Sequence, residues 1–178
     1  MIGTISWLPP FDSSFGQDVI YRLFNVAGIP YAVGFEAISS AHHLSAAKGI
    51  NMMQLYPAFT FPETGVWAVA FDGINPLAGD FLGFHHIQHQ GVMGGRVLFN
   101  VASIIYDHYT VCHAGAYVFS AASDRHQDRR TDLVEIYNGL LGLEGKSRSR
   151  LMRHLDGWKA YSDVVTGGRN YVITTQHY

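Results

Sequence analysis

The sequence predicts an α/β (or α+β) fold, in which a single mixed β-sheet carries helices on both sides. Short apolar segments with strand character alternate with segments whose apolar residues recur at helical spacing. Glycine and proline separate most of these segments. The 178 residues are 48% hydrophobic and 15% charged, which suits one domain with a real core. We therefore expect a single domain over residues 1–178, with residues 1–16 irregular.

The first third of the chain is expected to form two helices and one strand. Residues 17–27 place apolar side chains at the spacing of an amphipathic helix, which Gly28 would end. Residues 31–37 are a strand candidate. Residues 39–48 predict a short helix, because their leading serines can cap its start and a glycine follows its end. The segment 51–61 contains a proline and favours at best a bent or edge strand.

The middle of the chain predicts two strands and a buried helix. Residues 66–72 and 80–88 have strand character, and we expect them to form an antiparallel hairpin across the turn between them. Three glycines between residues 91 and 95 then loosen the backbone. Residues 96–109 are apolar on most faces, as expected of a helix that packs against a sheet.

The last third predicts two strands and two helices. Residues 116–122 have the apolar character of a buried strand. Residues 129–141 are amphipathic and end at a glycine, and residues 147–157 predict a further helix. Residues 171–175 predict a terminal strand. No internal repeat or linker interrupts this order.

Composition and charge exclude several classes of partner. The formal net charge of −2 gives no field that would attract nucleic acid or a membrane surface. The longest strongly apolar stretch, residues 97–106, is too short to span a bilayer. The single cysteine, Cys112, cannot form an internal disulfide, and the first residues lack the pattern of a secretory signal. We expect a cytoplasmic protein.

Two short motifs lie within the strand–helix–strand–helix order that begins at residue 81. Residues 97–101 read Val-Leu-Phe-Asn-Val, and residues 119–121 read Phe-Ser-Ala. In this order and in these motifs, the chain resembles the second half of a GNAT-type acetyltransferase. It looks most like the divergent acetyltransferase-like proteins that tailed bacteriophages encode. The resemblance implies a GNAT-like fold and acetyl-CoA as the acyl donor.

The resemblance also implies a place for the donor's diphosphate. In the family, a strand leads into a phosphate-binding loop at a helix N-terminus, where unpaired N–H groups and the helix dipole hold the anion. The corresponding cofactor-binding segment here runs from Gln88 to Arg96. Its glycines, Gly91, Gly94 and Gly95, would let the backbone approach the phosphate closely. An ordinary turn explains the same glycines.

Proton transfer is assigned to two positions on the same basis. Tyr137, near the end of the helix over 129–141, could return a proton to the departing thiolate. His86 or Gln88, near the end of the predicted strand over 80–88, could accept a proton from the attacking amine, directly or through water. A buried structural tyrosine explains Tyr137 equally well, because it shares a helix side with leucines at 133 and 140.

Other polar residues suggest weaker sites. His85 and His89 lie four apart in a predicted strand, too far to hold one ion together, so we expect no metal site. Adjacent side chains of a strand point oppositely, which argues against Cys112 and its histidine neighbour as a nucleophile pair. Glu36 and Glu63 are lone acids among apolar neighbours; either could be functional, although solvation in a loop is the default interpretation.

Three functions remain as hypotheses. The first is an acetyl-CoA-dependent N-acyltransferase, or a degenerate relative of one, encoded by a phage or mobile element. The second keeps the scaffold but loses the cofactor site, so that the protein binds a host or phage protein; Met93, at a position where the family has a small residue, motivates it. The third, an ADP-ribosyltransferase-like toxin, rests only on scattered His, Tyr and Glu residues. The oligomeric state is left open.

Overall fold

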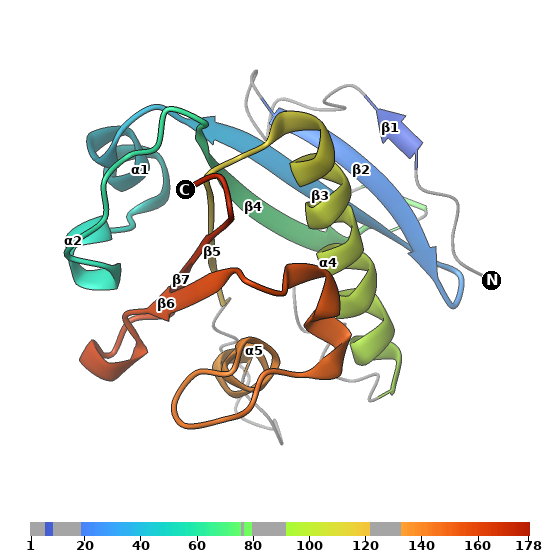
Figure 1. The fold of residues 1–178 in the computed structure, drawn as a ribbon. Coiled ribbons are helices and arrows are strands. Elements are labelled where there is room, and N and C mark those ends of the chain that lie inside the picture. Colours follow the sequence, from blue (N-terminus) through green and yellow to red (C-terminus); the bar gives the residue numbers. More distant parts are fainter. Residues whose placement is uncertain (1–5, 9–18, 76, 80–91, 122–132) are drawn as a thin grey trace.

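The protein is described by a computed structural model that covers residues 6–8, 19–75, 77–79, 92–121 and 133–178. Seven strands form one mixed sheet in the order β1-β2-β3-β4-β5-β7-β6. All neighbours in the sheet are antiparallel except β4 and β5, which are parallel. Helices flank the sheet, so the predicted α+β class is confirmed (Figure 1).

The N-terminal part of the sheet contains a strand where a helix was expected. β1 (Ser6–Leu8), within the segment predicted to be irregular, pairs with β2 (Val19–Val26), and β2 pairs with β3 (Ile29–Ile38). The prediction of a helix over residues 17–27 is therefore wrong. Ala27 and Gly28 have φ of 51° and 84°, the backbone of a two-residue hairpin turn. The glycine that was interpreted as a helix stop is half of this turn, and cross-strand pairing outweighs the helical spacing.

The predicted strand over 31–37 and the predicted helix over 39–48 are both present, the strand as β3 and the helix as α1 (Ala41–Lys48). The Ser40 side chain caps α1 by accepting from the His43 N–H, and Gly49 ends the helix at φ 66°. A four-residue helix, α2 (Met52–Leu55), follows in place of the bent strand. Its start is capped by the side chain of Asn51.

A parallel strand–helix–strand unit forms the centre of the molecule. β4 (Val66–Gly73) leads through residues 74–91 to α4 (Val92–Cys112), and β5 (Ala116–Ser120) follows. The predicted strand 80–88 lies outside the described residues. The strands that pair with β5 are β4 and β7, so β4 takes the neighbouring place that was expected for residues 81–88.

The C-terminal part completes the sheet. α5 (Leu133–Leu141) confirms the described part of the helix predicted over 129–141, whose first four residues lie outside the described part of the chain, and a 3₁₀ segment, η2 (Arg150–Leu155), stands where a third helix was expected. β6 (Lys159–Ser162), which the sequence did not indicate, forms the far edge of the sheet. A short 3₁₀ turn, η3 (Val164–Thr166), then leads to the predicted terminal strand, β7 (Asn170–Thr174).

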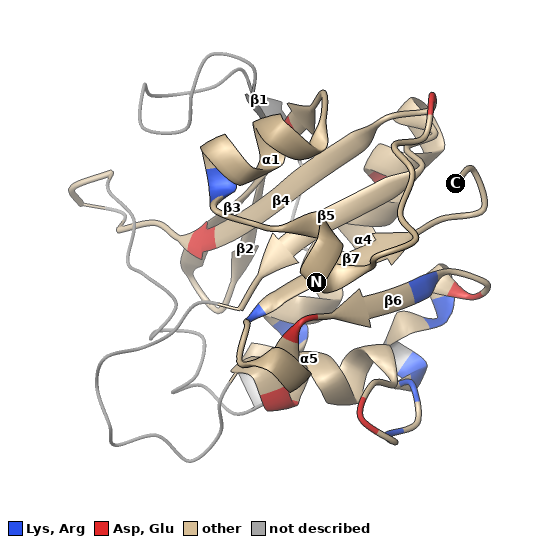
Figure 2. Ribbon diagram, turned by 90° about the vertical axis from the view of Figure 1, so that its left-hand side faces the viewer, with Lys and Arg blue, Asp and Glu red and all other residues tan. Residues whose placement is uncertain are grey.

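The two faces of the sheet carry different covers. α4, α5 and η2 pack on one face and contribute to the larger apolar core, whereas α1 and α2 pack on the other face over a smaller one. Figure 2 shows α1 lying across the middle strands of the sheet. In the described part of the chain, no helix combines the length and apolar character needed to cross a membrane.

Candidate functional site

The two parallel strands are joined at one end and separate at the other. Pairing is confined to three positions, from Val66 with Ala116 to Ala68 with Val118. Beyond them β4 stays paired with β3 as far as Gly73, while β5 continues beside β7. The sheet therefore opens between the carboxyl ends of β4 and β5. In open α/β sheets this is the place where ligands bind.

A cavity of about 310 Å³ occupies this opening. Strand residues that line it alternate between the two faces of the sheet: Ala68 and Val118 belong to the side of α1, whereas Val69 and Phe119 belong to the side of α4. The cavity therefore passes from one face of the sheet to the other. Its volume falls at the lower end of the range of about 300–1,000 Å³ that small-molecule sites occupy.

On the α4 side the lining is apolar apart from one phenol. Helix α4 contributes four aliphatic residues, and α5 and η2 add Leu140, Leu141, Met152 and Leu155. Tyr137, which α5 directs into this lining, is 4% exposed. Its ring packs edge-on against Phe119 and Tyr171, with centroids 5.6 and 5.5 Å away.

The Tyr137 hydroxyl is buried and has no hydrogen-bond partner among the described residues. Burial, with a smaller effect of Tyr171, raises the pKa of this phenol well above its ordinary value. The group is therefore a proton donor without an acceptor, held at the wall of a cavity. An orphaned buried hydroxyl costs free energy, and a ligand that accepted its proton would remove that cost.

On the α1 side the lining contains an ion pair. Glu36 of β3 and Lys48, at the end of α1, both line the cavity and form a salt bridge. Alternation along β3 directs the side chain of Glu36 away from the main core, where Phe35 points. The sequence marked Glu36 only as an acid in an apolar strand; its pairing with Lys48 was missed, because the two residues meet through α1.

The residues expected to bind the diphosphate divide into two groups. Gln88 and Gly91, like the expected base His86, lie outside the described residues. Gly94 and Gly95 are in the first turn of α4, not in a loop before it. The N–H group of Gly94 is among the four at the helix start that no helix carbonyl accepts, whereas that of Gly95 already bonds within the helix.

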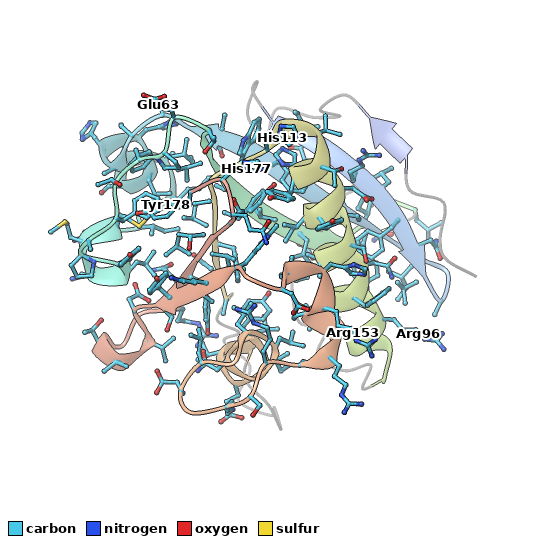
Figure 3. All side chains as sticks on the ribbon, viewed as in Figure 1. Glu63, Arg96, His113, Arg153, His177 and Tyr178 are labelled. Carbon is cyan, nitrogen blue, oxygen red and sulfur yellow. The ribbon has the colours of Figure 1, made fainter. Side chains whose placement is uncertain are left out.

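The start of α4 is close to the cavity and carries positive charge. Leu98 lines the cavity about 9 Å along the axis from the first residue of the helix. Arg96 of α4 is exposed, and Figure 3 shows it at the same end of the helix as Arg153 of η2. η2 packs on α4 there, since the His154 ring lies 6.3 Å from that of Phe99.

Comparison of the chain with protein-family models, with curated proteins and with solved structures finds no match. The resemblance to GNAT-type acetyltransferases, the phage setting and acetyl-CoA as a donor therefore stay predictions. A function has to be inferred from the cavity and the groups that line it.

Proposed function

We propose that this protein transfers an acyl group from a coenzyme A thioester, acetyl-CoA in the first instance, to an amine. The observation that carries the proposal is the cavity between the parted ends of β4 and β5, with the unpartnered Tyr137 hydroxyl in its wall. A long, narrow ligand with a reactive end suits a passage through a sheet better than a compact one does. The thioester-bearing arm of coenzyme A is such a ligand.

The gap beside β4 supports the binding of that arm. From Val69 to Gly73 the strand does not pair with β5, and residues 69–71 line the cavity, so an extended ligand can lie along this part of the strand. The apolar side chains from α4 and α5 would exclude water from the rest of the arm.

The start of α4 supports the binding of the diphosphate. The unpaired N–H groups of the first turn, including that of Gly94, attract an anion. A Cβ at Gly95 would have no atom of the described residues within 4 Å. Arg96 and Arg153 add positive charge at this end of the helix. The chain's order from β4 through α4 and β5 to α5 is also the order that the GNAT resemblance implies, with β4 as the first strand.

Proton transfer would use groups on opposite sides of the gap. When the thioester breaks, the leaving thiolate needs a proton, and the Tyr137 hydroxyl, which has no hydrogen-bond partner among the described residues, is available to donate one. The amine must lose a proton, and Glu36 is the carboxylate in the described lining. This places donor and acceptor on different faces of the sheet, with the reacting carbonyl between them.

Thiol release tests the proposal. Acetyl-CoA is mixed with the protein and a panel of primary amines, including a polyamine, an amino acid and a lysine peptide, and free thiol is measured. We expect turnover with at least one amine, and a loss of about 100-fold in Tyr137→Phe. Tyr106→Phe, on α4 but not in the cavity lining, is the control and keeps its rate. Absence of both thiol release and calorimetric binding at millimolar acetyl-CoA would contradict the proposal.

A further inference from the structure

The ion pair at the α1 end of the cavity brings a primary amine to the proposed acyl donor. The side chains of Lys48 and Glu36 are 36% and 22% exposed, so the pair is partly withdrawn from water without being sealed. Lys48 is the last residue of α1, where the helix dipole favours a cation, and the Gly49 cap directs the chain away from it. The amine is thereby held at one place in the lining.

The chain offers a natural comparison for this amine. It contains three lysines, and the other two, Lys146 and Lys159, are exposed and do not line the cavity. Lys159 lies on the edge strand β6, and Lys146 follows α5. Among the lysines, only Lys48 combines a carboxylate partner with a position in the cavity wall.

We propose that Lys48 is itself an acceptor, so that the protein acylates its own α1. The inference rests on the proposed acyl transfer and identifies lysine side chains as an acceptor class. Glu36 takes a proton from the Lys48 ammonium, and the neutral Nζ attacks the thioester carbonyl carbon. The new C–N bond replaces the C–S bond, and the nitrogen loses its second proton to water. The thiolate takes the proton of Tyr137, and the protonated water returns a proton to the Tyr137 oxygen, so Glu36 keeps the one proton that is released overall. The products are an amide and a free thiol.

The cavity favours this step in two ways. A bound donor would exclude water, and a low-dielectric surrounding penalises an ion pair relative to a neutral amine and carboxylic acid. The amine and the carbonyl would also be held in one cavity, which raises their effective concentration. Acylation removes the charge of Lys48, so the salt bridge with Glu36 is lost and the carboxylate becomes available to another ammonium group.

Peptide mass spectrometry tests the proposal. The intact protein is incubated with acetyl-CoA, and acetylation of each lysine is followed with time. We expect Lys48 to be modified at least about tenfold faster than Lys146 or Lys159, because only its amine shares a cavity with the donor. Glu36→Gln should slow modification of Lys48 and leave the other two lysines unchanged. Lys48→Arg should remove the selective signal while circular dichroism shows a folded protein.

Acetic anhydride supplies the control, because it acylates lysines without a binding site. If it also modifies Lys48 tenfold faster, the selectivity reflects reactivity alone and the proposal is overturned. If calorimetry shows acetyl-CoA binding but Lys48 is modified no faster than Lys146, the proposed self-acylation is contradicted, whereas the proposed binding site for the donor is retained. If acetyl-CoA does not bind, the proposed function fails, and the inference fails with it.

Discussion

The two ends of the junction between β4 and β5 differ: one end is paired and packed, and the other end contains a cavity. At the closed end, Trp67 pairs with Tyr117, and His108 of α4 fills the space beneath them; its ring stacks on Phe35 at 4.2 Å and its Nδ1 lies 2.8 Å from the Tyr117 hydroxyl. At the open end, a cavity replaces strand pairing, and the Tyr137 hydroxyl has no hydrogen-bond partner among the described residues. The closed end therefore provides stability, whereas the open end keeps a space that folding alone does not require.

The largest expected effect is a pH dependence at the closed end. Burial, with a smaller contribution from the positive charge of Arg22, lowers the pKa of His108 from 6.5 to about 4. Between these values the unfolded chain binds a proton that the folded protein excludes. Stability present above pH 6.5 should therefore fall by about 3 kcal/mol as the pH drops to 4. Urea unfolding of wild type and of His108→Gln over this pH range measures the loss of stability. If the free energy of unfolding falls equally with pH in both proteins, His108 is not its cause.

A smaller loss is expected from a methyl group at the start of β5. A Cβ on Gly115 would lie 2.5 Å from both Pro62 Cγ and Thr64 Oγ1, and the Gly115 N–H donates to the Gly65 carbonyl at 2.9 Å. The Pro62 ring is fixed to the backbone, and rotation of the Thr64 side chain would break its hydrogen bond to the His177 carbonyl. Gly115→Ala should therefore reduce the free energy of unfolding by about 2 kcal/mol. Thermal denaturation checks this. An unchanged midpoint would show that the closed end is loosely packed.

A matched pair of substitutions compares the two ends directly. Ala116 is fully buried at the closed end, whereas Ala102 of α4 is buried but lines the cavity. Ala116→Leu should cost about 1–3 kcal/mol through overpacking. Ala102→Leu has space to enter and should change the stability by less than about 0.5 kcal/mol. Equal losses in chemical denaturation would mean that the cavity is closed in solution.

The smallest expected effect concerns the stability of the open end. Tyr137→Phe removes a buried hydroxyl that has no partner among the described residues. The folded protein should be unchanged or more stable by up to about 1 kcal/mol, because an unsatisfied polar group is no longer buried. Calorimetric melting measures this. A clear destabilisation would show that the hydroxyl has a structural partner and is not held ready for a ligand.

Local signals in the sequence were enough for the elements whose ends are set by capping or by a long apolar face. The serine and glycine that bound α1, the apolar face of α4 and the strand character of β4 all predicted what the structure contains. β2 was predicted as a helix because the spacing of its apolar residues fits a helix as well as a strand. Pairing with β3 makes it a strand. β6 gave no signal, since an edge strand buries little.

The candidate site was also predictable only in part, because it depends on contacts between segments that are distant in the sequence. Tyr137 could be chosen as a candidate site residue from its place near a helix end. That its hydroxyl has no hydrogen-bond partner among the described residues depends on the cavity. The cavity in turn depends on where β4 and β5 stop pairing, which register and neighbouring strands determine. The meeting of Glu36 with Lys48 joins a strand to a helix and has no local signature.

We propose that the gap between β4 and β5 holds the arm of coenzyme A. Calorimetric titration of coenzyme A into wild type, Ala102→Leu and Ala47→Leu tests it most directly, since Ala102 lines the cavity and Ala47 is an exposed residue of α1. We predict binding to wild type and to Ala47→Leu, and affinity for Ala102→Leu reduced by at least about tenfold, or 1.4 kcal/mol. Equal binding to all three proteins, or no binding to wild type, would contradict the claim.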